Sequence, residues 1–254
     1  MPGQDGHGEG RLYQKLARLL FDDLASGRYA IGDRLPAERE LSTEHNISRP
    51  AVREALIALE VQGFVEVRVG SGTYVRRLPA QDDTPGFAIT AFELTETRLL
   101  FEGEAAALAA QHINDEELDR LDRLVAAIAE ENLHADVTED ADRAFHLLIA
   151  RATRNLGVLV TIEQLWHLRA TSPQCALLHD KARSAKVRPV VAEHRAIAQA
   201  LRARDPAAAR AAMRAHLAAV MDHLLFTTEE RVIEEARRSL DSTRARYTMT
   251  GAFQ

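Results

Sequence analysis

Four side chains in the second half of this sequence have the types and spacing that suit one divalent metal ion. Asp142 and His146 are four residues apart, so on a helix they project from one face about 6 Å apart. His194 and His216 each lie on an apolar stripe of a later predicted helix, so both imidazoles face an interior in which they need a partner. Zinc accepts carboxylate and imidazole ligands, and one ion would serve all three histidines.

The same pattern has a simpler explanation, which periodicity alone favours. Each histidine could be a separate core residue that hydrogen-bonds to a carbonyl or a carboxylate. His223 lies seven residues after His216 on nearly the same helix face, so it competes for the fourth ligand position. We expect the histidines in loops or charged segments to be solvated surface residues: His7, His45, His112, His134 and His179.

A second group of residues could bind an organic anion. Arg98 shares a helix face with apolar neighbours, where an unpaired guanidinium would be costly. A buried salt bridge to Glu102, four residues later, explains Arg98 as well as an anion clamp does. Trp166 and Arg169 could form the opposite wall of the site, although Trp166 serves equally well as ordinary core. Gln164 and Arg169 are candidate partners for hydroxyl groups of the ligand.

The first third of the chain contains a different motif, a winged helix-turn-helix over residues 35–75. The helices that would position the metal and anion ligands follow it. Residues 37–45 carry the pattern of a short helix. Ser48 is a suitable N-cap and Pro50 a suitable first-turn residue, so a second helix should run from about residue 49 to residue 61.

This second helix and the hairpin after it supply the expected DNA contacts. Arg49 and Arg53 are four residues apart near the end of the helix that such motifs insert into the major groove, so they are candidates for contacts to bases. The hairpin turns at Gly70 to Gly72, where the backbone can approach phosphate closely. Because one such helix contacts few bases, we expect a homodimer on a short inverted repeat of double-stranded operator DNA.

From residue 91 onward the pattern is helical throughout, so the chain should be mainly α, with an all-α helical bundle after the winged helix. Two prolines and a glycine in the segment 78–91 indicate a linker. We therefore expect a DNA-binding domain over residues 1–77, an effector-binding domain over 92–227 and a C-terminal tail over 228–254. The helices are predicted near residues 92–111, 114–131, 138–152, 155–180, 184–203 and 206–226.

Composition is consistent with two folded domains. The chain has 254 residues, 46% of them apolar, and a net charge of −6. Residues 1–78 contain 11 basic and 11 acidic residues and are therefore neutral, so the net negative charge comes entirely from the rest of the chain. A single cysteine, Cys175, excludes an intrachain disulfide, and the polar N-terminus resembles no signal peptide. We expect a cytoplasmic protein without a membrane span.

Several motifs give the chain a family resemblance. LPAERELS followed by SRPAVREALIALEVQGFVEVRVGSGTYV resembles the DNA-binding domain of the GntR family of bacterial transcription factors. FELTETRLLFEGEAAALAA, DRAFH, EHRAIAQAL and AAMRAHL resemble, in order and spacing, the FCD effector domain of the FadR branch of that family. GFVEVRVGSGTYV and LWHLRATSPQCALLH are most similar to the hexuronate-utilisation repressors of this branch.

The resemblance implies roles for individual residues. It implies a divalent metal ion, zinc first and nickel or manganese as alternatives, held by Asp142, His146, His194 and His216, with AAMRAHL favouring His216 over His223. It places Arg98 near the effector. It implies DNA contacts from Arg39, Ser48, Arg49, Arg53 and Gly70. Pro50-Ala51 departs from the polar residues that many members have at this point, which removes hydrogen bonds to phosphate.

Two classes of function fit these observations. The first is a metabolite-responsive regulator, expected to be a repressor of sugar-acid catabolism that a hexuronate bound at the metal releases from its operator. Lactate, gluconate or a dicarboxylate are alternative effectors. The second is a metal-dependent enzyme, in which an open coordination position activates water. The sequence has no HExxH motif and no obvious carboxylate base beside the ligands, which favours the regulator.

Overall fold

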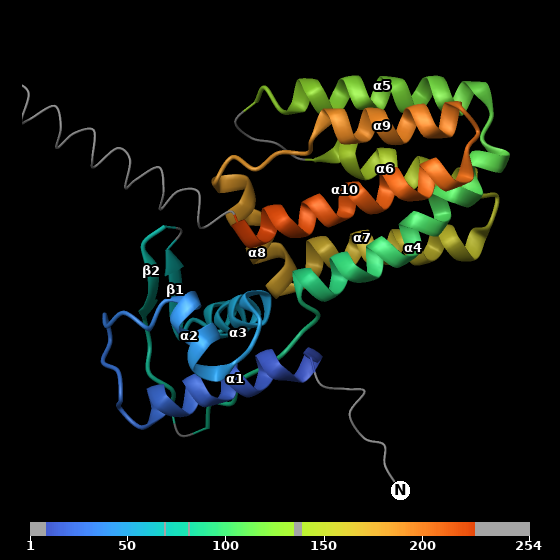
Figure 1. Cartoon of the computed structure of the whole chain (residues 1–254). Helices are drawn as coiled ribbons and strands as arrows, with labels where there is room; N and C mark the ends of the chain where they lie inside the picture. The colour runs from blue at the N-terminus through green and yellow to red at the C-terminus, as the bar shows by residue number, and fades with distance from the viewer. Residues whose placement is uncertain (1–8, 69, 81, 135–138, 227–254) are drawn as a thin grey trace, which may run out of the picture. The chain divides into compact units, whose positions relative to one another are not determined.

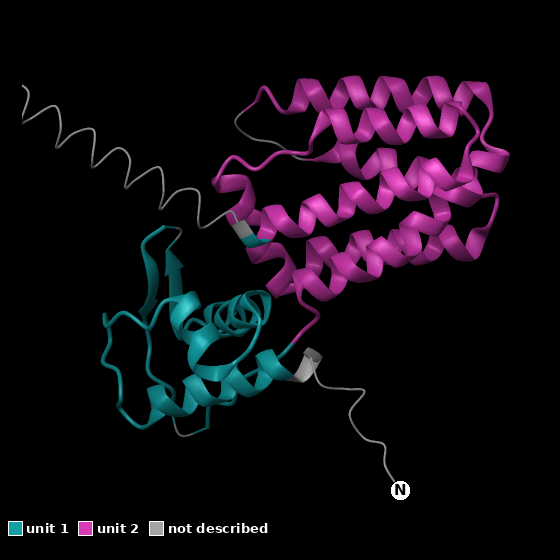
Figure 2. Ribbon diagram, viewed as in Figure 1, with its two compact units in different colours: residues 1–87, 225–254 teal, residues 88–224 magenta. Residues whose placement is uncertain are grey.

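Contacts between residues divide this computed structural model into two units, shown in Figure 2. The structure describes residues 9–68, 70–80, 82–134 and 139–226. Unit 1 comprises residues 1–87 and 225–254, and unit 2 comprises residues 88–224. The division falls inside the predicted linker, 78–91. The predicted tail, 228–254, lies outside the described residues.

Unit 1 contains the predicted winged helix-turn-helix, which the structure confirms (Figure 1). Two strands follow three helices and pair in antiparallel register, with Val65 opposite Val75 and Arg68 opposite Gly72. The elements are α1 (Glu9–Ala25), α2 (Glu38–His45), α3 (Arg49–Val61), β1 (Val65–Arg68) and β2 (Gly72–Val75).

Local residue types explain where these elements begin and end. Asn46 adopts a left-handed conformation with φ of 52° and ends α2. The Ser48 hydroxyl accepts a hydrogen bond from the Ala51 amide at 3.4 Å, which caps α3. At the wing tip Gly72 has φ of +117°, a backbone conformation that residues with a Cβ rarely adopt, which explains the glycine there. Apolar side chains of α1 and α3 then form the core of this unit: Leu16, Leu20, Leu24, Val52, Leu56 and Leu59.

Unit 2 is all-α, as predicted. Four of its helices, α4, α5, α6 and α9, pack against one another, and α5 and α9 lie side by side in Figure 1. The helices are α4 (Ala91–His112), α5 (Asp115–Glu131), α6 (Asp140–Ala152), α7 (Leu156–Thr171), α8 (Pro173–Ser184), α9 (Val191–Arg202) and α10 (Pro206–Phe226). Among the described helices, none is both long enough and apolar enough to cross a bilayer.

The prediction of one helix over residues 155–180 was wrong. The chain breaks at Ser172, which is extended with ψ of 123°, and α8 starts at Pro173. Proline has no amide hydrogen and forces the preceding residue out of the helical region, so it begins a helix more readily than it continues one. The next helix also starts later than predicted, at Val191 rather than near residue 184.

The core of unit 2 should dominate its stability, and the single tryptophan makes this measurable. Leu121 is fully buried, whereas Leu156 is 73% exposed. We expect Leu121→Ala to lower the free energy of unfolding by about 2–5 kcal/mol because it leaves a cavity. Leu156→Ala should change it by less than about 0.5 kcal/mol. Trp166 is buried in unit 2, so its fluorescence during urea denaturation reports this unit. Equal midpoints for the two variants would contradict the assignment of the core.

Candidate functional site

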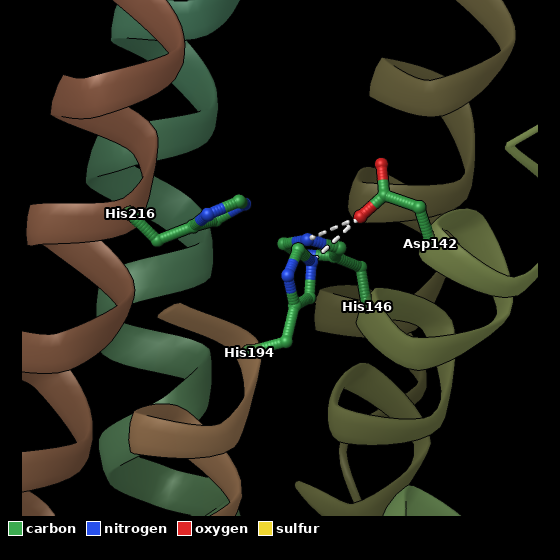
Figure 3. Close-up of side chains that lie close together, drawn as sticks. All are labelled: Asp142, His146, His194 and His216. Atoms are coloured by element: carbon green, nitrogen blue, oxygen red, sulfur yellow. Dashed lines mark hydrogen bonds and ion pairs between the residues drawn. The ribbon is translucent and has the colours of Figure 1, made fainter. Parts of the chain in front are cut away.

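The four predicted ligands meet at one buried point of unit 2 (Figure 3). Asp142 and His146 come from α6, His194 from α9 and His216 from α10. One potential ligand atom from each lies within 4.8 Å of every other. This spread suits donors placed around a single ion at the metal–ligand distances of about 2 Å typical of zinc. His223 is not in the cluster, so the structure favours His216 as the fourth residue.

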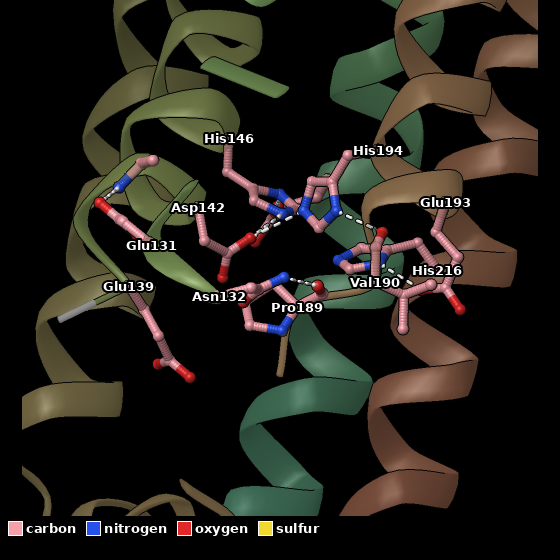
Figure 4. Close-up of polar contacts among 12 residues, drawn as sticks. Glu131, Asn132, Glu139, Asp142, His146, Pro189, Val190, Glu193, His194 and His216 are labelled. Carbon is pink, nitrogen blue, oxygen red and sulfur yellow. Dashed lines mark hydrogen bonds and ion pairs between the residues drawn. The ribbon is translucent and has the colours of Figure 1, made fainter. Parts of the chain in front are cut away.

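Packing fixes the orientation of these side chains. Phe145 is fully buried, and its ring lies edge-on to His146 and His194, with centroids 5.7 and 5.1 Å away. The N-terminal turn of α6 is held by the Ala141 amide, which donates to the Glu131 carboxylate at 3.1 Å (Figure 4). The two donors of α6 therefore project from a helix that is secured at its end and along its buried face.

Each imidazole uses its Nδ1 outside the cluster, which leaves Nε2 to face the centre. His194 Nδ1 donates to the Val190 carbonyl at 2.9 Å, and His216 Nδ1 lies 2.8 Å from Glu193 Oε2 (Figure 4). His146 Nδ1 is hydrogen-bonded to the Glu102 carboxylate. Metal-binding histidines have this arrangement, because the outer hydrogen bond fixes the tautomer and the ring.

The inner atoms of the cluster fit a metal ion better than they fit one another. His194 Nε2 lies 2.8 Å from Asp142 Oδ1, but His146 Nε2 lies 3.5 Å from the same oxygen and is buried without a hydrogen bond. An enclosed imidazole nitrogen with no partner is costly. A divalent cation bound by three nitrogens and one carboxylate oxygen would satisfy it, so the donor set fits the predicted metal.

The electrostatics favour the metal-binding protonation state at Asp142 and His216 but not at His146. Burial alone would lower the pKa of His146, but the Glu102 and Asp142 carboxylates outweigh burial and raise it, so a metal ion would have to displace a proton from this ring. Burial alone would raise the pKa of Asp142, but the His146 and His194 imidazoles outweigh burial and hold it well below its ordinary value. Burial lowers the pKa of His216 to about 4, despite the Glu193 carboxylate beside it. Asp142 is therefore ionised and His216 neutral at neutral pH, as ligands must be.

Arg98 forms the buried salt bridge to Glu102, which is one of the two roles that the sequence allowed for it. Its Nε donates to Glu102 Oε1 at 2.6 Å, and both side chains are at most 3% exposed. Burial alone would raise the pKa of Glu102, but Arg98 and His146 together lower it to about 2. Arg98 also lies 4.2 Å above the Trp166 ring, and its Nη2 is buried with no hydrogen bond. An anion-binding role for this nitrogen stays a prediction.

A cavity within unit 2 opens onto the cluster. It has about 490 Å³ of empty space when its open mouth is included. Asp142 and His216 lie in its wall together with Arg169, whose Nη2 is 2.5 Å from Glu139 Oε2. Figure 4 shows Glu139 on the side of Asp142 away from His216. Arg169 Nε is buried without a hydrogen bond, so it retains a donor, as its predicted role requires.

Two predicted positions were wrong. Gln164 is exposed on α7 and is not in the cavity wall, because it lies two residues before the buried Trp166 and thus on the opposite face of the helix. His179 was expected on the surface but is only 6% exposed and lines the cavity. Glu139 and Glu193 were not among the predicted site residues. The only available signal for Glu193 was its place next to His194, in the first turn of α9.

The predicted DNA contacts all lie in the helix-turn-helix and wing of unit 1. Arg39 is exposed on α2, and Gly70 has a positive φ of 75° in the wing. Ser48 uses its oxygen as the cap acceptor, which leaves the hydroxyl hydrogen for a phosphate. On α3, Arg53 is buried at 2% exposure, contrary to what a base contact requires, and it forms two bonds to the Glu38 carboxylate, at 3.0 and 2.6 Å. No contact with DNA is present to test these assignments, Arg49 included.

Comparisons with known proteins match both units. Residues 12–75 match the model described as bacterial regulatory proteins, gntR family, and residues 93–219 match the FCD domain. The Exu regulon transcriptional regulator of Escherichia coli is 38% identical over 213 residues, covering 82% of each chain. The Uxu operon regulator of Haemophilus influenzae is 35% identical over 82% of this chain and 79% of its own. The solved structure of Streptococcus agalactiae GntR is 29% identical, with a TM-score of 0.41 over 82% of this chain and 98% of that one.

The donor geometry predicts one divalent ion per chain. We expect His194→Ala to lose the ion, because it removes one of four donors and leaves Asp142 without its 2.8 Å partner. His223→Ala is the matched control, since His223 lies at the cavity but outside the cluster, and it should retain the ion. Elemental analysis after gel filtration, together with melting temperature, measures both. Full metal content in His194→Ala would leave only separate core histidines.

Proposed function

The chain belongs to the gntR family of bacterial regulatory proteins and contains an FCD domain, and on this basis we propose that it is a repressor released from DNA by a small carboxylate. Unit 1 binds the operator and unit 2 binds the effector beside a divalent metal ion. The observation that supports the effector site most strongly is that metal donors and partnerless guanidinium nitrogens occur together in the interior of unit 2.

On the DNA side, α3 enters the major groove and the wing contacts the backbone beside it. Arg49 and Arg53 contact bases, while Arg39, Ser48 and Gly70 contact phosphate. The Arg53 side chain is buried and bound to Glu38 through two bonds, so a contact with a base requires that its guanidinium leave this carboxylate. Unit 1 has too few such contacts to specify a genomic site alone, so the protein binds an inverted repeat as a homodimer.

On the effector side, Asp142, His146, His194 and His216 hold the metal, with zinc as the first candidate and nickel or manganese as alternatives. The ion supplies a positive charge that attracts a carboxylate. Arg98 Nη2 and Arg169 Nε are buried donors without partners, and guanidinium groups match carboxylates in geometry. The site is therefore complementary to an acid rather than to a neutral sugar.

The acid is a hexuronate such as galacturonate or glucuronate. The relatives with 38% and 35% identity are named as regulators of the Exu regulon and the Uxu operon. Each match covers 82% of the present chain. The cavity wall offers both cationic and neutral polar side chains, as a ligand with one carboxylate and several hydroxyls requires. The effector regulates by favouring a conformation that binds the operator poorly, and a coupling of about 1–3 kcal/mol lowers operator affinity by one to two decades.

The recognition helix can be tested separately from the effector site. We expect Arg49→Ala to weaken binding to the matched operator by about 1–3 kcal/mol, because it removes a contact to a base edge. Binding of the effector should not change. Lys15→Ala is the control, since Lys15 is an exposed cation on α1. Fluorescence anisotropy with a labelled operator measures both variants, and wild-type affinity for Arg49→Ala would refute the assignment of α3.

The effector can be identified by titrating acids against the complex of protein and operator. We expect galacturonate or glucuronate to release the DNA at concentrations at which lactate, gluconate and short dicarboxylates do not. Arg98→Ala should weaken the response, because it removes one of the two guanidinium donors, while Glu102 keeps its bond to His146 and Arg169 remains. Release by lactate and by neither uronate would refute the sugar-acid assignment. An Arg98→Ala protein that responds normally would exclude Arg98 from the site.

A further inference from the structure

His179 is a buried histidine that the metal cluster does not use. It lies on α8, is 6% exposed and lines the cavity that also contains Asp142 and His216. Among the residues that the structure describes, none forms a hydrogen bond to its ring. Buried polar groups almost always have a partner, so an imidazole in a cavity wall without one is available to a ligand.

The helix that bears His179 is firmly placed. Ser172, just before α8, donates its hydroxyl hydrogen to the Ile89 carbonyl at 2.9 Å. Arg183 follows His179 by one helical turn, and its Nη1 lies 3.4 Å from the Glu139 carboxylate. His179 and Ala182 are three residues apart and both line the cavity, so one face of α8 forms this part of the wall. A site on an anchored helix can distinguish ligands by geometry.

The charge around His179 fixes its chemical character. Burial, reinforced by the nearby guanidinium groups of Arg169, Arg98 and Arg183, holds the pKa of His179 well below its ordinary value. The ring is therefore neutral at neutral pH and offers one N–H donor and one nitrogen acceptor. His179 is therefore a hydrogen-bonding group and adds no positive charge to those of Arg98, Arg169 and Arg183.

A neutral imidazole is complementary to a hydroxyl group and less so to a carboxylate. A hydroxyl can both accept from the ring N–H and donate to the other nitrogen, whereas a carboxylate only accepts. The cations of the cavity are better partners for the carboxylate, since Arg169 Nε retains an unused donor. His179 lines the same cavity as Asp142 and His216, so an acid whose carboxylate lies at the metal donors occupies the cavity that His179 borders.

We propose that His179 is a specificity-determining residue that hydrogen-bonds a hydroxyl group of the effector and so selects a polyhydroxylated acid over an acid without hydroxyls. This inference rests on the proposed function, because it assumes that a carboxylate binds in the same cavity. It adds the property that the carboxylate contacts cannot provide: the metal donors and the arginines attract any small acid, and His179 distinguishes among them. A site that leaves a buried polar group unpaired with the wrong ligand penalises that ligand strongly.

The test compares two acids that share a ring and a carboxylate. Galacturonate has ring hydroxyls, and tetrahydropyran-2-carboxylate has none. Isothermal titration of the metal-loaded full-length protein gives the dissociation constant for each. For His179→Leu we expect binding of galacturonate to weaken about 10- to 100-fold, the usual effect of leaving a ligand hydroxyl unpaired. Binding of tetrahydropyran-2-carboxylate should change less than about threefold, because its carboxylate contacts remain.

Two further variants make the result specific. His179→Gln retains a donor and an acceptor and should recover part of the affinity for galacturonate. His167→Leu replaces an exposed histidine of α7 and should leave both constants unchanged. Metal content and the urea midpoint from Trp166 fluorescence show whether each variant is folded. If His179→Leu does not fold, the comparison of His179→Gln with wild type still decides, since only galacturonate should respond to it.

Each of the remaining outcomes contradicts either the role of His179 or the proposed function. Unchanged binding of galacturonate in His179→Leu, or equal weakening of both acids, overturns the role of His179 and leaves the acid sensor intact. Equal affinity of the wild-type protein for the two acids shows that hydroxyls are not recognised and also overturns it. Failure of wild type to bind either acid refutes the proposed function itself, and this inference with it.

Discussion

The burial of Asp142 among three imidazoles is the constraint on which the rest of unit 2 depends. An ionised carboxylate inside a helical bundle is tolerated only if positive charge or hydrogen bonds compensate it. Of the three imidazoles, His194 lies 2.8 Å from Asp142 Oδ1, whereas His146 lies 3.5 Å from it. The three rings are also turned so that each Nδ1 bonds outward, to Glu102, Val190 or Glu193. All four inner atoms therefore face one point, which explains why a cation there would stabilise the fold.

Contacts around that point join helices that are distant in the sequence. Glu102 of α4 connects His146 of α6 with Arg98, and Arg98 lies over Trp166 of α7. Arg169 of α7 then pairs with Glu139 before α6. A ligand that takes a hydrogen bond from either arginine would therefore alter contacts on several helices at once. Such a shared network is a physical route by which an acid could change the conformation of the whole bundle.

The sequence predicted that Asp142, His146, His194 and His216 lie together because part of their signal is local. Asp142 and His146 share a helix face by spacing alone, and the helix-turn-helix is defined by caps and glycines such as Ser48 and Gly70. Residues whose positions depend on tertiary contacts could not be predicted from the sequence. His179 has charged neighbours in the chain, yet its helix turns it into the cavity, and Glu102 meets His146 across 44 residues of sequence. Missing the break at Pro173 placed α8 wrongly and concealed this wall.

The central claim is that the effector binds at the metal itself. Replacing the ion by Co²⁺ gives visible absorption bands that depend on the number and type of ligands, so they report directly whether a carboxylate enters the coordination sphere. We predict that galacturonate changes the position and intensity of these bands at the same concentrations at which it releases operator DNA. An unchanged cobalt spectrum while the DNA is released would show that the acid acts elsewhere, and would contradict the account.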